Sequence, residues 1–118
     1  MIIQVVNTDE KFYKYMGKFF GSRTIEKQIN DRIYDDDDKV WYLNIEEDRV
    51  VAFASVCRNL IKNVYATKDS YLVELLQYLK KEVKIRPSTV TNIYRETYEK
   101  AGYQIMTDEA YKNFVKIS

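Results

Sequence analysis

The chemistry open to this chain is limited first by a missing residue type, because its 118 residues contain no histidine. Without histidine, the commonest general base, the Ser–His and Cys–His nucleophile pairs and most zinc sites are excluded. The single cysteine, Cys57, gives a structural zinc site too few ligands. Proton transfer must therefore use carboxylates, tyrosine, lysine, the cysteine or water. We predict no metal site.

One run of residues combines a candidate proton donor with the element that would position it. It reads Y-E-K-A-G-Y from Tyr98 to Tyr103, and we expect a short helix over 94–101. Gly102 would close this helix, since glycine readily takes the left-handed conformation that ends helices. A tyrosine hydroxyl can act as a general acid when it lies in a cleft and neighbouring groups tune its pKa. Because the chain has 11 tyrosines, a merely packed side chain is the alternative for Tyr98.

Two other groups of residues are candidates for a catalytic or binding role, and each can also be explained by a purely structural role. Glu46, Glu47 and Asp48 are candidates for a base or for binding an amine. A charged run between two strand-like segments is also typical of a hairpin turn. Cys57 is a candidate nucleophile without a histidine partner. In a strand it would behave as a small apolar core residue.

Four consecutive aspartates, Asp35 to Asp38, precede Lys39. Like charges repel, and aspartate has poor strand propensity, so we expect a solvated connector here. A calcium or magnesium site is the alternative, because these cations prefer oxygen ligands, although the spacing is not that of an EF-hand loop. D-D-D-D-K is also an enteropeptidase cleavage sequence, which we interpret as native because well-patterned segments flank it.

Hydrophobic periodicity predicts the elements that would hold these residues. Alternating or β-branched runs predict strands, and apolar residues three and four apart predict helices. The expected strands are 2–6, 40–45, 49–57, 60–66, 89–93, 103–106 and 113–117. The expected helices are 8–20, 23–33, 70–83 and 94–101, with Asn7, Ser22 and either Asp69 or Ser70 as capping residues of the first three.

The resulting order is β-α-α-β-β-β-α-β-α-β-β. It predicts an α+β fold in which helices pack on a mixed, mostly antiparallel sheet of about six to seven strands. The length suits one domain, 1–118, with one hydrophobic core. We find no internal repeat and no linker that would divide it.

Bulk composition is that of an ordinary globular protein and narrows its partners. Apolar residues make up 46% of the chain and charged residues 31%, and the net charge is +1. This charge disfavours nucleic acid, for which Lys80, Lys81, Lys84 and Arg86 are the candidate residues. With no membrane-length apolar run and no signal-peptide pattern, we expect a cytoplasmic protein. Abundant lysine, isoleucine, asparagine and tyrosine point to an AT-rich genome, such as that of a low-GC bacterium or its phage.

The order of elements and three short runs resemble the GNAT superfamily of N-acetyltransferases. The runs are V-V-A-F-A-S-V at 50–56, N-V-Y-A at 63–66 and Y-E-K-A-G-Y at 98–103. They are similar to the family's third strand, fourth strand and C-terminal part. The resemblance covers nearly the whole chain and implies a three-strand meander followed by a long central helix.

Acetyl-CoA is the cofactor that the resemblance implies, and roles for particular residues follow from it. Backbone groups of Val64, Tyr65 and Ala66 would hold the pantetheine arm, where the family's fourth strand splays from the fifth. Tyr98 would protonate the leaving thiolate as an amine attacks the acetyl group. Asn92, near the end of the fifth expected strand, would touch the cofactor.

The stretch that should meet the pyrophosphate departs from the family pattern. Family members carry a glycine-rich loop whose backbone N–H groups approach the phosphates at a helix start. Here 66–71 reads A-T-K-D-S-Y, which is shorter and contains neither glycine nor arginine. The amide groups at Asp69, Ser70 and Tyr71 would have to meet the phosphates, and the Asp69 carboxylate would repel them.

Two function classes remain open from the sequence. The chain is either a non-catalytic relative that binds another protein, as phage-encoded or regulatory factors do, or an active enzyme that acetylates an amine. The missing loop favours the first class. Exposed tyrosines suit partner binding, and a homodimer is also compatible with the sequence. The candidate exposed tyrosines are Tyr13, Tyr15, Tyr34, Tyr94 and Tyr111.

Overall fold

The computed structural model describes residues 1–106 and 112–118 and has the predicted order of elements. The strands are β1 (Ile2–Val5), β2 (Lys39–Glu46), β3 (Arg49–Cys57), β4 (Leu60–Ala66), β5 (Ser88–Thr91), β6 (Ile105–Met106) and β7 (Phe114–Ile117). The helices are α1 (Phe12–Met16), α2 (Arg23–Ile29), α3 (Asp69–Glu82) and α4 (Arg95–Lys100), with a 3-10 turn η1 (Asn92–Tyr94). The polar turn expected at 107–111 lies outside the described residues.

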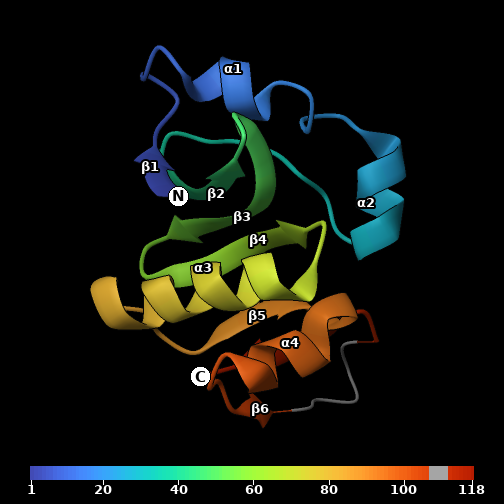
Figure 1. Cartoon of the computed structure of the whole chain (residues 1–118). Helices are drawn as coiled ribbons and strands as arrows, with labels where there is room; N and C mark the ends of the chain where they lie inside the picture. Colours follow the sequence, from blue (N-terminus) through green and yellow to red (C-terminus); the bar gives the residue numbers. More distant parts are fainter. Residues whose placement is uncertain (107–111) are drawn as a thin grey trace.

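The strands form two antiparallel sheets, in the orders β1-β2-β3-β4 and β5-β7-β6. Figure 1 shows β4 of the first sheet beside β5 of the second, with α3 and α4 close together and α1 and α2 away from them. The α+β prediction is therefore confirmed. Among the described residues, no helix is long and apolar enough to cross a membrane.

Alternation along β2, β3 and β4 supplies two hydrophobic clusters, one for each face of the first sheet. On one face Ala52, Ala54 and Val64 pack with the buried leucines of α3, which are Leu72, Leu75, Leu76 and Leu79. On the other face Trp41, Leu43 and Phe53 pack with residues of α1 and α2, among them Phe12, Met16 and Ile29. Small alanines on the first face let the long helix approach the sheet closely.

The N-terminal helices differ from the sequence prediction. The expected helix over 8–20 is reduced to α1, and Phe19 and Phe20 lie in the turns that follow it. Asn7 does not cap it, because its side-chain amide donates to the carboxylates of Asp35 and Asp37 instead. Local capping has thus given way to a tertiary contact.

The second helix begins as expected and ends early. Ser22 caps it by accepting the N–H of Ile25 at 3.4 Å. Asn30 then takes a left-handed conformation, with φ of 54°, and ends the helix at Ile29. Ile33, expected on its apolar face, is buried beyond its end.

Two hairpins with two-residue turns connect β2, β3 and β4. The turn residues Glu47 and Asp48 have φ of 50° and 62°, and Arg58 and Asn59 have φ of 52° and 67°. Positive φ at both central residues is the geometry whose twist matches that of paired strands. The prediction that Glu46, Glu47 and Asp48 join two strands is confirmed. Cys57 is the last residue of β3 and is half-buried.

The second turn offers a matched test of backbone conformation. Asn59→Ala should lower the free energy of unfolding by about 1 kcal/mol, because alanine tolerates positive φ poorly, whereas Asn59→Gly should leave it unchanged or raise it. Asn59 is exposed, so side-chain packing contributes little to either change. Urea denaturation of the two variants checks the difference, and equal stabilities would mean that the turn relaxes at no cost.

Candidate functional site

The site implied by the sequence lies where β4 and β5 run side by side (Figure 1). The described residues form no ladder between these two strands. They are joined where they begin, where the Arg86 N–H donates to the Asn59 carbonyl at 2.7 Å and the Ile61 N–H donates to Ser88 Oγ at 2.9 Å. Toward the end of β4, the outward-facing backbone groups must find other partners.

Tyr94 supplies those partners at Ala66. Its hydroxyl accepts the Ala66 N–H at 3.1 Å and donates to the Ala66 carbonyl at 3.3 Å. The ring is half-buried and packs against both hydrophobic clusters. Burial raises the pKa of the Tyr94 phenol, which keeps it neutral and able to donate and accept at once. Both backbone groups of Ala66 are therefore occupied by a side chain of this chain.

Asp69, at the start of α3, is turned toward α4. Its carboxylate accepts the Thr97 hydroxyl at 2.9 Å and the Lys100 ammonium at 3.4 Å. These hydrogen bonds, led by that from Thr97, lower the pKa of Asp69. The prediction that Asp69 or Ser70 caps α3 is wrong, because the N-cap is Lys68, which makes no side-chain capping bond.

Tyr98 lies inside the molecule. Its side chain is fully buried, and its hydroxyl donates to the Thr91 carbonyl at 2.7 Å. Burial, followed by the charges of neighbouring Tyr94 and Asp31, raises the pKa of Tyr98 well above 10.0. This geometry gives the hydroxyl a structural partner, and its catalytic role stays a prediction.

The other predicted cofactor residues are dispersed. Val64 and Tyr65 are buried in β4, Ser70 is exposed, and Asn92 is exposed in η1 rather than in a strand. Tyr71 is half-buried, and its carbonyl accepts the Asn44 side chain at 3.1 Å. The structure brings Ala66 and Asp69 together with η1 and α4 through Tyr94 and Thr97.

A cavity of about 470 Å³ lies beside the start of α3. Its lining includes two predicted residues, Tyr65 and Tyr71. Three cationic side chains, Lys18, Arg49 and Lys68, also line it, without an acidic residue among its described lining. This chemistry suits an anion.

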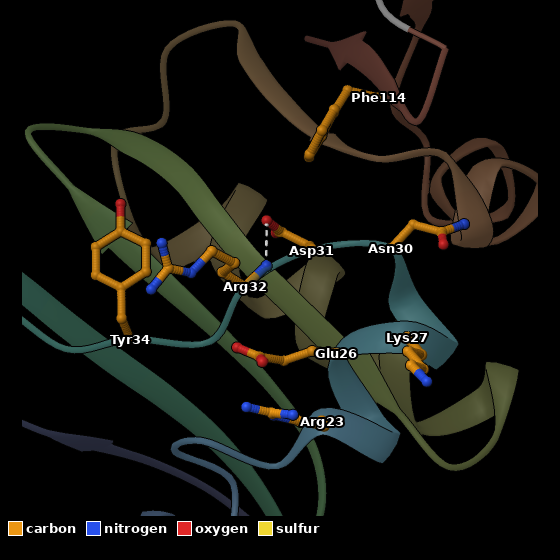
Figure 2. A pocket seen from close by; sticks show the side chains of 8 residues that line it. All are labelled: Arg23, Glu26, Lys27, Asn30, Asp31, Arg32, Tyr34 and Phe114. Atoms are coloured by element: carbon orange, nitrogen blue, oxygen red, sulfur yellow. Dashed lines mark hydrogen bonds between the residues drawn. The ribbon is translucent and has the colours of Figure 1, made fainter.

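A second, mixed-charge cleft lies beneath α2 (Figure 2). Its volume is about 550 Å³, and an adjoining cavity of about 320 Å³ shares Asp31, Tyr34 and Phe114 with it. We call the two cavities together the α2 cleft. It carries side chains of both charges, namely Arg23, Glu26, Lys27, Asp31, Arg32 and Lys62.

Buried polar side chains hold the irregular segment 30–34 that forms one wall of the α2 cleft. Asn63, 2% exposed, donates to the Arg32 carbonyl at 2.8 Å. The Ile33 N–H donates to Glu26 Oε2 at 2.8 Å, and Thr91 Oγ1 donates to the Ile29 carbonyl. These bonds from α2, β4 and β5 fix a segment without regular structure.

Lys39 is the charged member of this network. It is 3% exposed, and its ammonium donates to the Tyr34 carbonyl at 2.8 Å and to Asn63 Oδ1 at 2.9 Å. The same ammonium lies 3.3 Å from the centre of the Tyr34 ring, a cation–π contact. Burial lowers the pKa of Lys39, so holding it here has a free-energy cost.

The aspartate run is less solvated than the sequence predicted. Asp35 is half-buried, and its carboxylate accepts the Trp41 indole N–H at 2.8 Å. Asp36, Asp37 and Asp38 are exposed, as expected of a connector. Among the described residues, no group of acidic or cysteine side chains is arranged to hold a metal ion.

Asp31 is half-buried in the α2 cleft, and among the described residues it forms no ion pair within 4.0 Å, although the Lys39 ammonium attracts it from farther away. Its Oδ1 accepts the N–H of Arg32 at 2.8 Å, and its Oδ2 has no hydrogen-bond partner among residues 1–106 and 112–118. Burial raises the pKa of Asp31. Sequence reasoning missed Asp31, Tyr94 and Asn63 as site residues. Only the spacing of Tyr94, four residues before Tyr98 on the expected helix, was a local signal.

Solved structures share this arrangement over almost its full length. Escherichia coli ElaA aligns over 99% of this chain and 97% of its own, with a TM-score of 0.61 and 11% identity. The aminoglycoside 6'-N-acetyltransferase from Enterococcus faecium covers 99% and 93%, with a TM-score of 0.59 and 12% identity. The Campylobacter jejuni N-acetyltransferase PseH, in complex with acetyl coenzyme A, covers 99% and 96%, with a TM-score of 0.54 and 13% identity.

The chain therefore has the GNAT N-acetyltransferase fold, as the sequence predicted. No protein-family model matches the sequence, and no curated protein matches it. At these identities the likeness concerns the fold, and function must be argued from the residues.

Tyr98→Phe tests whether the hydroxyl is structural. We expect the free energy of unfolding to fall by about 1–3 kcal/mol, because the buried Thr91 carbonyl loses its donor. Tyr13→Phe is the matched control, since Tyr13 is 66% exposed. Chemical denaturation measures both, and equal stability of the two variants would show that Thr91 does not need this bond.

The contributions of Asp31 and Asp48 to folding stability should change with pH in opposite directions. The folded pKa of Asp31 is raised above 3.8, so the folded state retains a proton that the unfolded state has lost, and stability falls as pH rises through that window. The pKa of Asp48 is lowered, mainly by the Tyr15 hydroxyl at 2.8 Å, so its contribution is lost as pH falls.

At neutral pH, Asp31→Asn should therefore be more stable than the parent protein and Asp48→Asn less stable. Both differences should shrink as the pH falls below the pKa of an unfolded aspartate, about 3.9. Urea denaturation across this range measures them. A destabilised Asp31→Asn at neutral pH would mean that the ionised carboxylate has a stabilising partner.

Proposed function

We propose that this chain is a non-catalytic GNAT-fold factor that binds another protein and whose cofactor groove is filled by its own side chains. The observation that carries the proposal is the Tyr94 hydroxyl on both backbone groups of Ala66, at 3.1 and 3.3 Å. In the resemblance to active enzymes, the backbone of Val64 to Ala66 is where pantetheine would bond. A pantetheine arm would have to displace Tyr94 from a half-buried position that both hydrophobic clusters support.

Contacts at the start of α3 support the same conclusion. Asp69 places a carboxylate in the first turn of α3, where phosphate groups would approach. Its hydrogen bonds to Thr97 and Lys100 tie α3 to α4 and keep the carboxylate ionised. The Asp69 carboxylate therefore keeps a negative charge beside the first turn of α3, which disfavours a pyrophosphate at this position.

Exposed apolar side chains support a role in binding a protein partner. Tyr13, Tyr34, Ile93 and Met106 are between 49% and 66% exposed. Tyrosine and methionine are enriched at protein interfaces. Tyrosine buries much area for little lost flexibility.

An acetyl-CoA-dependent N-acetyltransferase is the second candidate function. It is favoured by the unpaired β4 and β5 and by the cationic cavity of about 470 Å³ beside α3. In this candidate Tyr98 is the general acid, and its hydroxyl would have to leave the Thr91 carbonyl to reach a thiolate.

Calorimetric titration with acetyl-CoA separates the two candidates. We expect no saturable heat from the parent protein at millimolar cofactor, which corresponds to binding weaker than about −4 kcal/mol. Tyr94→Ala should gain measurable binding, because it frees the Ala66 backbone and removes the ring. Tyr13→Ala is the control, since it removes an exposed tyrosine far along the chain from this groove.

The decisive result is that of the parent protein. Saturable micromolar binding would overturn the proposal and return the chain to the enzyme class. A pull-down with the folded parent chain, and with Tyr13→Ala and Ile93→Ala as surface variants, then tests the protein-binding part. Recovery of the same partner by all three would remove these exposed side chains from the interface.

A further inference from the structure

The α2 cleft collects aromatic side chains that neither hydrophobic cluster uses. Tyr34 and Phe114 line both of its cavities and belong to neither cluster of the described residues. Tyr34 is 50% exposed and Phe114 is half-buried. In Figure 2 the Phe114 ring points toward Asp31, and the Arg32 side chain extends toward Tyr34. The cleft thus has apolar surfaces at two sides of a charged floor.

In the described part of the chain, the charged side chains of the cleft form no ion pairs within 4.0 Å. Within residues 1–106 and 112–118, neither Asp31 nor Arg32 has an ion-pair partner within 4.0 Å. The same holds for the other cationic groups of the cleft, which are Arg23, Lys27 and Lys62. A half-buried carboxylate with one free oxygen is stabilised by a cation, and a guanidinium by a carboxylate that it can bind with two parallel hydrogen bonds.

Glu26, the second carboxylate of the cleft, already has a structural partner. Its Oε2 accepts the Ile33 N–H at 2.8 Å and so helps to shape the wall. Asp31 uses one oxygen in the same way and leaves the other free. The cleft therefore has one acidic group and several cationic groups available for a ligand.

The wall that carries Asp31 and Arg32 is held in place by groups that are costly to bury. Asn63 fixes the Arg32 carbonyl, and the Lys39 ammonium fixes both the carbonyl and the ring of Tyr34. Ser55 in turn donates to Asn63 at 2.6 Å. Buried polar groups of this kind, fully bonded, hold a binding surface in one conformation before the ligand arrives.

From these observations we propose that the α2 cleft binds a free α-amino acid with an apolar side chain. The ligand's ammonium lies on the free oxygen of Asp31, and its carboxylate lies on the Arg32 guanidinium. Its side chain lies against Tyr34 and Phe114. A cavity of about 550 Å³ is within the range of small-molecule sites, roughly 300–1,000 Å³. This site involves neither acetyl-CoA nor acetyl transfer, so it stands apart from the function proposed above.

The test is calorimetric titration of the full chain with L-phenylalanine and two analogues, in the absence of acetyl-CoA. L-Phenylalaninamide lacks the carboxylate, and N-acetyl-L-phenylalanine lacks the ammonium. We expect saturable submillimolar binding of the free amino acid. Each analogue should bind at least about tenfold more weakly, the loss expected when one charge-assisted hydrogen bond is removed.

Charge-matched variants locate the site. Asp31→Asn and Arg32→Gln should each weaken binding of L-phenylalanine by about tenfold or more. Glu82→Gln and Lys84→Gln remove the same charges from exposed positions at the far end of α3 and should change nothing. Since Asp31→Asn is expected to be at least as stable as the parent, its loss of binding cannot be ascribed to unfolding. Circular dichroism of every variant confirms that each is folded.

Several outcomes overturn the proposal. The absence of heat with free L-phenylalanine at millimolar concentration would do so. If either analogue binds as tightly as L-phenylalanine, the site recognises only one of the two charges. The ligand is then a simple amine or a simple acid. Unchanged affinity in both Asp31→Asn and Arg32→Gln would place the binding elsewhere.

Discussion

The structure depends on how the backbone groups at the end of β4 are satisfied. β5 joins β4 only where the two strands begin, so the outward-facing groups of β4 lie beside an opening in the sheet. A buried N–H or carbonyl without a partner costs about 1–3 kcal/mol, so these groups need water, a ligand or a side chain as a partner. Tyr94 is that side chain. Tyr94 is the last residue of η1, directly before α4, and this contact therefore ties η1 to the end of β4.

This occupant accompanies a connection between β4 and α3, residues 67–68, that contains no glycine. With Tyr94 at Ala66, the chain itself satisfies the β4 backbone where the resemblance places pantetheine, and Thr97 holds the Asp69 carboxylate beside it. The scaffold then needs no ligand for its stability. The start of α3 is different, because its N-cap Lys68 makes no side-chain capping bond and Asp69 bonds to side chains of α4 instead.

The α2 cleft depends on a different constraint, which is the burial of the Lys39 side chain. Its ammonium is held by a carbonyl, an amide oxygen and an aromatic face, and no carboxylate of the described residues is hydrogen-bonded to it. Burying a charge in this way is unfavourable unless the bonds it makes are well formed. Those bonds hold segment 30–34, so the α2 cleft keeps its shape and its unpaired charges. Stability is also lost at Asp31 in the same region, because burial raises the pKa of its carboxyl group more than the Arg32 N–H and the Lys39 ammonium lower it.

The sequence by itself determined the elements whose patterns are local. The alternation of β2 to β4, the leucine stripe of α3, Ser22 as a cap and Gly102 as a stop were all readable, because each depends on residues a few positions apart. Their order was enough to predict the fold. Where a local rule competed with a distant partner it failed, as at Asn7 and Asp69. Only the tertiary structure decided that Tyr94 reaches Ala66, that Lys39 reaches Asn63, and that Asp31 forms no ion pair within residues 1–106 and 112–118. These contacts join residues that are far apart along the chain, and their free energy depends on burial, which no local pattern reveals.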